Sequence, residues 1–249
     1  YTDYLLRLVR FDLGTSFRST DVPVLSYISD RLPKTLELVF AAALLAVMVG
    51  IPLGALAARI GGLVDTLISS LTTLGISMPV YVIGTIFVLV FSLQWGMFPA
   101  GGYATLEANP VGHFQRLVLP AIALSFGIGS VVARMTRSSV LETVAQDWVR
   151  TARSQGLPRA QVFRRHVIRN SLTPVVTTLG LEIGTLLGST VLIERVFTWP
   201  GMGSLLIDAV NARDYPVVQG IVIVIAALFI LINLIVDLLY GVLDPRARQ

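Results

Sequence analysis

The chain has 249 residues, of which 54% are hydrophobic and 14% charged, and its mean hydropathy is +0.77. Soluble domains carry roughly 25% charged residues, so the composition excludes an ordinary soluble protein and indicates an integral membrane chain. The absence of cysteine excludes disulfides and zinc–thiolate sites, and the net charge of +4, mostly arginine, gives no reason to expect a nucleic-acid partner.

Residues 1–34 are expected to lie outside the membrane. The stretch from Tyr4 to Arg10 has amphipathic helical spacing, which fits an interfacial helix on the outer leaflet as well as a partner-binding role. The sequence opens on Tyr1 with no signal-peptide pattern. We therefore expect one further span upstream, giving six in all.

Five apolar runs are long enough to cross the membrane, which takes about 20 helical residues for roughly 30 Å of hydrocarbon. The sequence therefore predicts an all-α polytopic membrane domain over residues 35–249. The predicted spans are residues 35–58, 66–93, 117–133, 172–193 and 217–240. Their internal prolines and glycines are compatible with membrane helices.

The arginines predict the orientation of these spans. Eleven of the 19 basic residues fall in the segment 134–169, at Arg59 and in the C-terminal tail, against eight elsewhere. Because short loops rich in arginine and lysine stay in the cytoplasm, we place this segment inside and the loop of residues 194–216 outside.

The cytoplasmic segment, residues 134–171, has its own predicted structure. The pattern from Ser139 to Glu142 is typical of a capping box and predicts that a new helix starts there. Gly156 is expected to end that helix, Pro158 to open a second one, and Pro174 to begin the next span. An alternative is that the arginines of the second helix lie on anionic lipid.

Polar groups inside the spans are candidates for a translocation path. Glu182 lies opposite a stripe formed by Gly180, Gly184 and Gly188, and a carboxyl in the bilayer should face a cavity or a polar partner. Glu182 and Asn233 are our candidates, although Glu182 fits helix packing equally well. For Asp237 a salt bridge to Arg134 or Arg137 is the favoured interpretation.

The chain shows no pattern for catalysis of its own. A phosphate-binding loop needs a lysine after glycine, whereas the only lysine, Lys34, follows Pro33. The pair Gly127 and Gly129 lies within a span and is not a dinucleotide fingerprint. His113 and His166 are expected on opposite sides of the membrane, so we predict no catalytic residues, no metal site and no cofactor bound by this chain.

Two motifs resemble a known family. The stretch from Arg150 to Leu157 (RTARSQGL), continuing to Pro174, is similar to the "EAA" loop of bacterial ABC importer permeases in its dipeptide/oligopeptide variant. The general form has Glu-Ala-Ala before the glycine, where this chain has Arg150-Thr151-Ala152. The stretch from Glu194 to Gly203, followed by Arg213-Asp214-Tyr215-Pro216, resembles the external loop of the same permeases.

The resemblance implies a type I ABC importer transmembrane domain in a bacterial inner membrane. It implies four kinds of partner: a homologous second permease, two cytoplasmic ATPases that carry ATP and Mg²⁺, an external solute-binding protein, and a peptide as substrate. The residues implied in coupling to the ATPase are Val149, Arg150, Thr151, Ala152, Arg153, Gln155, Gly156 and Leu157. Those implied at the external mouth are Trp199, Pro200, Gly201, Gly203, Arg213 and Asp214.

Within this resemblance the apolar residues Val149, Ala152 and Leu157 are expected to contact the ATPase, with the arginines giving orientation. Two alternatives stay open. The same architecture imports nickel chelates or glutathione in other members, and an ATP-independent transporter or channel would use ionisable groups in the spans.

Overall fold

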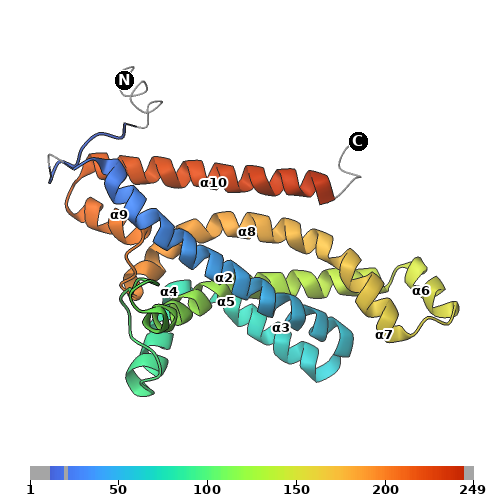
Figure 1. The fold of residues 1–249 in the computed structure, drawn as a ribbon. Helices are drawn as coiled ribbons and strands as arrows, with labels where there is room; N and C mark the ends of the chain where they lie inside the picture. Colours follow the sequence, from blue (N-terminus) through green and yellow to red (C-terminus); the bar gives the residue numbers. More distant parts are fainter. Residues whose placement is uncertain (1–11, 20–21, 244–249) are drawn as a thin grey trace. The chain divides into compact units, whose positions relative to one another are not determined.

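The computed structural model describes residues 12–19 and 22–243 (Figure 1). In these residues every regular element is helical apart from one β-bridge between Thr15 and Pro23, which confirms the all-α class. The elements are α2 (Val24–Ile60), α3 (Gly62–Ser77), α4 (Val80–Phe87), the π-helix η1 (Val88–Gln94), α5 (Pro110–Val144), α6 (Asp147–Ser154), α7 (Arg159–Val162), the π-helix η2 (Phe163–Val167), α8 (Ile168–Val196), α9 (Met202–Asn211) and α10 (Tyr215–Leu243).

Four helical stretches of the described chain are long and apolar enough to cross a membrane. They contain the predicted spans 35–58, 117–133 and 172–193 and most of 217–240; their bounds are Val24–Ile60, Pro110–Val144, Arg159–Val196 and Tyr215–Val236. These helices agree with the sequence prediction of a polytopic membrane domain.

The predicted continuous span at 66–93 is wrong. Residues Gly62–Ser77 and Val80–Gln94 form two helices bent by 106°, and only together do they make a fifth crossing. Met78 is extended, with φ −87° and ψ 129°, and precedes Pro79. Proline disfavours helical backbone in the residue before it and has no N–H to continue the hydrogen-bond ladder, so the break falls there.

Three predicted boundaries also differ. Helix α2 begins at Val24, so the helix that contains the predicted span 35–58 starts within the segment 1–34. No helix starts at Ser139, because α5 continues through it and its hydroxyl donates to the Ser171 carbonyl at 2.8 Å. Pro174 lies inside α8, which continues directly from α7 and η2. Packing between helices has overridden these local signals.

The chain divides into two compact units. Unit 1 comprises the described residues within 1–41, 80–124 and 185–231, and unit 2 those within 42–79, 125–184 and 232–249. In unit 1 the starts of α2 and α10 pack with α9 around a buried apolar cluster; its members are Val24, Ile28, Met202, Ala209, Val217 and Ile221. In unit 2 a smaller cluster forms where α5 to α8 meet; its members are Val140, Val149, Val162 and Val167.

Glycines in unit 2 allow helix backbones to approach closely. A Cβ on Gly54 of α2 would lie 2.3 Å from the Ala133 carbonyl oxygen of α5, and one on Gly50 would lie 2.7 Å from that of Gly129. Small residues four apart on both helices form this contact, as is usual between membrane helices.

The glycines of α8 differ in their surroundings. A Cβ on Gly180 would lie 2.0 Å from Val236 of α10, so another helix approaches closely there. A Cβ on Gly188 would meet no described atom within 4 Å.

We expect Gly54→Ala to lower the stability of the folded protein by about 1–3 kcal/mol, the usual cost of overpacking, because the added methyl would overlap a backbone carbonyl. Gly188→Ala is the matched control, since its methyl enters open space. The melting temperatures of the two purified variants in the same detergent check this. Equal melting temperatures would show that α2 and α5 tolerate separation.

Candidate functional site

A buried carboxylate organises the loop between α8 and α9. Glu194, in the last turn of α8, is 0% exposed. Its Oε1 accepts a hydrogen bond from Thr35 Oγ1 at 2.7 Å, and its Oε2 accepts one from the Ser204 amide at 2.9 Å. Thr35 Oγ1 accepts in turn from the Met202 amide at 2.8 Å. Glu194 and Thr35 thus satisfy free amides at the N-terminus of α9, where the helix dipole also favours a negative charge.

The geometry around this carboxylate demands glycine at two positions. A Cβ on Gly201 would lie 2.2 Å from Glu194 Oε1, and one on Gly203 would lie 2.4 Å from Val191 Cα. Gly201, the N-cap of α9, carries no side-chain cap of its own. The glycines expected at the external mouth are therefore required by the packing of Glu194 and α8 against α9.

Trp199 connects the same loop to α2. Its side chain is only 1% exposed. Its Nε1 donates to the Lys34 carbonyl at 3.0 Å, and its ring meets that of Tyr103 edge to face at 4.8 Å. We call Thr35, Glu194, Trp199, Gly201 and Ser204 the α8–α9 latch. The latch joins α2, the end of α8 and the start of α9 within unit 1.

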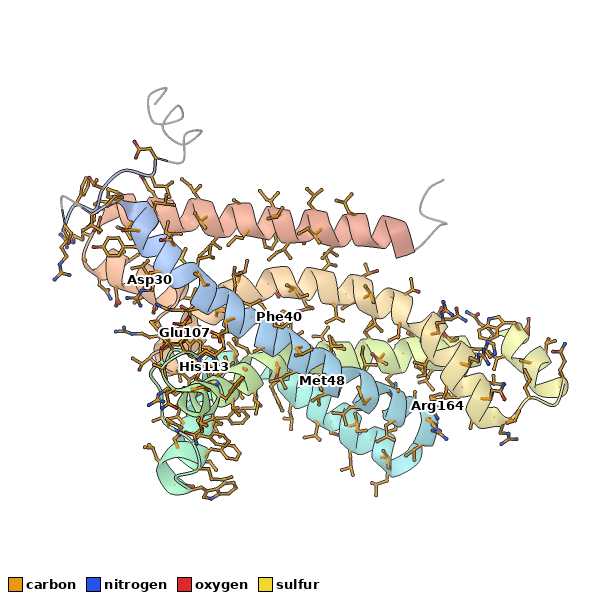
Figure 2. The ribbon with its side chains drawn as sticks, in the orientation of Figure 1. Asp30, Phe40, Met48, Glu107, His113 and Arg164 are labelled. Atoms are coloured by element: carbon orange, nitrogen blue, oxygen red, sulfur yellow. The ribbon has the colours of Figure 1, made fainter. Side chains whose placement is uncertain are left out.

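His113 belongs to this neighbourhood, although the sequence suggested an external loop. It lies in the first turn of α5 (Figure 2) and is 2% exposed. Its Nε2 lies 2.5 Å from Glu37 Oε1 and its Nδ1 lies 2.7 Å from the Ala104 carbonyl oxygen. His113 therefore ties α5 and the preceding loop to α2. Neither Glu37 nor Thr35 is among the site residues predicted from the sequence, and both lie near the start of an apolar run.

Asp214 anchors the N-terminal segment to the beginning of α10. It is buried and accepts hydrogen bonds from Ser16 Oγ and from the Phe17 amide, the latter at 3.1 Å. Burial raises the pKa of Asp214, but the hydrogen bonds from Ser16 and from backbone amides outweigh it, so the pKa lies below the ordinary value of 3.8. Arg213 precedes it with a left-handed φ of 55°.

The two pathway candidates lie in unit 2. Glu182 on α8 and Asn233 on α10 are both half-buried, and both make interactions within the protein. Their role in translocation stays a prediction. The side chain of Asp237 lies outside the described residues, so its salt bridge stays a prediction. Of the two arginines named for it, Arg137 binds Asp65 of α3, with Nη2 2.6 Å from Oδ2, and Arg134 donates to Thr73 Oγ1 at 3.3 Å.

The segment predicted to be cytoplasmic, residues 134–171, is supported by packing within the chain. Gly156 has a left-handed φ of +80° and follows α6, as the sequence predicts. Val149, expected to contact an ATPase, is instead fully buried with Val140, Val162 and Val167. Ala152 and Leu157 are half-buried against the same cluster. Val149 therefore holds α6 onto its own chain rather than offering a contact surface.

The outward face of α6 is polar and aromatic. Trp148 and Thr151 are exposed and three residues apart, which places them on one side of the helix, and Gln155, which is also exposed, follows the end of α6. Arg150 is exposed on a different side of α6, and the side chain of Arg153 lies outside the described residues. Figure 1 shows α6 beyond the ends of α2 and α3 in unit 2, where a partner can reach this face.

We expect Glu194→Gln to destabilise the protein by about 1–3 kcal/mol. The side-chain NH₂ of the glutamine would face either the Thr35 hydroxyl or the Ser204 amide, and that donor would lose the acceptor that the carboxylate now provides. Asp208→Asn is the matched acid-to-amide control. Asp208 is mostly exposed and lies 3.3 Å from Arg195, and exposed pairs contribute about 0–1 kcal/mol. Thermal unfolding of both variants checks this; an equal, small effect would mean that the latch does not hold the loop.

The comparisons with known proteins agree with this architecture. A family model described as "Binding-protein-dependent transport system inner membrane component" matches residues 50–249. The dipeptide transport system permease protein DppB of Escherichia coli (strain K12) is 40% identical, in an alignment covering 100% of this chain and 80% of that protein. The oligopeptide transport system permease protein AppB of Bacillus subtilis (strain 168) is 39% identical, covering 99% of this chain and 79% of that protein.

Solved structures show the same fold. The MetNI methionine ABC transporter in an inward-facing conformation matches with a TM-score of 0.71 at 18% identity, covering 88% of this chain and 97% of that chain. An amino acid ABC transporter with histidines matches with a TM-score of 0.64 at 21% identity, covering 89% of this chain and 94% of that chain. The fold is that of a type I importer transmembrane domain. The chain belongs to the family of binding-protein-dependent transport system inner membrane components, the multi-pass permease subunits of ABC importers.

Proposed function

We propose that this chain forms, with a homologous permease, the pathway of an ATP-driven importer of dipeptides or oligopeptides. The observation that carries the proposal is its identity of about 40% over essentially its whole length to the dipeptide and oligopeptide permease proteins. Two cytoplasmic ATPases would bind ATP and Mg²⁺, and an external solute-binding protein would deliver the peptide. Nickel chelates or glutathione are the alternative substrates.

The cytoplasmic loop would receive the motion of the ATPase through the outward face of α6. Trp148, Thr151 and Gln155 offer exposed contacts, and Arg150 adds a charge that orients the partner. The opposite side of α6 is anchored by the buried Val149 in a cluster shared with α5, α7 and η2. A displacement of α6 would therefore move the cytoplasmic ends of the long helices together with it.

The α8–α9 latch would keep the mouth of the pathway in one shape while the binding protein releases its ligand. Its polar contacts are made within the chain, and Glu194 and Trp199 are both nearly inaccessible. The latch residues are therefore positioning residues rather than substrate contacts. Glu182 and Asn233 remain our candidates for the path itself.

Reconstitution tests the proposed function directly. The chain, its partner permease and its ATPases are placed in liposomes, and uptake of a radiolabelled dipeptide is measured with ATP and the cognate binding protein. We expect accumulation that requires both. Mass spectrometry of the ligand held by the binding protein separates peptides from glutathione and nickel chelates. Uptake that proceeds without any ATPase would overturn the proposal in favour of a secondary transporter.

We expect Gly156→Val to reduce uptake at least tenfold while the protein still inserts in the membrane, because a β-branched residue at φ +80° distorts the turn that presents α6. Gly61→Val is the matched control. Gly61 has φ +68° with open space around it, at the turn between α2 and α3. Copurified ATPase and peptide uptake are measured for both variants. If the two variants transport equally, the turn at Gly156 has no special part in coupling.

A further inference from the structure

The turn between α2 and α3 marks the depth of the membrane surface. Helix α2 ends at Ile60 and α3 begins at Gly62, so one residue joins two apolar helices. Large apolar side chains are exposed on both sides of the turn, Ile60 by 57% and Leu63 by 75%. Exposed apolar groups of this size on a membrane protein face lipid, and a connection of one residue has no length to leave the interface. Arg59, the last basic residue of α2, therefore lies at headgroup depth.

A stacking contact places a second segment at the same depth. The guanidinium of Arg59 lies over the ring of Phe163, with Cζ 5.3 Å from the ring centroid, a cation–π contact within unit 2. Phe163 opens the π-helix η2, and the next two residues, Arg164 and Arg165, are both exposed. Figure 2 labels Arg164 beside the end of α2. Three arginines thus gather at one level; we call Arg59, Arg164 and Arg165 the basic collar.

The collar has no acidic counterpart in the part of the chain that the structure describes. Asp65, the acidic residue of α3 close to the turn, is bound by Arg137 through two guanidinium nitrogens. None of the ion pairs recorded for residues 12–19 and 22–243 includes a collar arginine. The collar is therefore an exposed positive surface at headgroup depth, bordered by lipid-facing leucine and isoleucine.

We propose that the basic collar binds the phosphate-bearing headgroups of anionic phospholipid in the cytoplasmic leaflet. Guanidinium groups donate several hydrogen bonds to phosphate oxygens in a fixed fork, and each arginine near an anionic surface adds attraction that falls with salt. An ATPase is the less suitable occupant, because the exposed face that suits it lies on α6, whereas the collar lies beside the α2–α3 turn among the exposed apolar side chains Ile60 and Leu63. The proposal requires only a membrane-embedded chain and does not depend on a peptide substrate.

The test measures lipid selectivity in the assembled transporter. The complex is reconstituted in vesicles of phosphatidylcholine with 30% phosphatidylglycerol, and electron spin resonance of spin-labelled phosphatidylglycerol and phosphatidylcholine gives their relative association with the protein. We expect a preference for phosphatidylglycerol that falls at least threefold in Arg164→Gln/Arg165→Gln and also falls as salt is raised. Arg18→Gln/Arg195→Gln, which removes two exposed external charges, should keep the preference.

An unchanged preference for phosphatidylglycerol in the collar variant, with folding verified by its melting temperature, would overturn the proposal. If that variant also loses the ATPase subunits on purification, the collar is assigned to the ATPase instead. Failure of peptide uptake would leave the lipid measurement intact, so the two proposals fail separately.

Discussion

The buried carboxylate of Glu194 is the contact on which the packing around the α8–α9 loop depends. It joins the end of α8 and the start of α9 to Thr35 of α2, which is far away in sequence. A carboxylate without partners costs several kcal/mol when buried, so the fold must supply donors. It does so with a hydroxyl and the free amides at the start of α9, and the glycine at Gly201 leaves the space for it. Trp199 and its loop take their position from that arrangement.

Helix α6 is held by a different kind of interaction. There the valines of α5, α6, α7 and η2 form an apolar cluster, and α6 is attached by one buried residue, Val149, while its other side stays exposed. Apolar packing fixes the attachment and a polar outer face leaves the surface open to a partner. The same helix can thus be firmly connected to the spans and available for docking, which is what a coupling element requires.

Sequence patterns predicted the elements better than their boundaries. Glycine at 156 with a left-handed φ was predictable because few other residues adopt that conformation. The capping-box pattern at Ser139 predicted a helix start that is not there. Ser139 lies inside the continuous helix α5, and its hydroxyl donates a hydrogen bond to the Ser171 carbonyl of α8. Val149 was taken for a docking residue because a short amphipathic helix does not reveal which of its faces is covered by its own chain.

Segment length, hydropathy, glycine conformation and motif spacing are local properties, and they are enough to predict a helical membrane chain that turns at Gly156 and resembles the ABC importer permeases. The burial of Glu194 and His113, the inward side of Val149 and the stacking of Arg59 on Phe163 become visible only in the folded chain. Such contacts join residues distant in sequence, and their free energy depends on neighbours that no local pattern specifies.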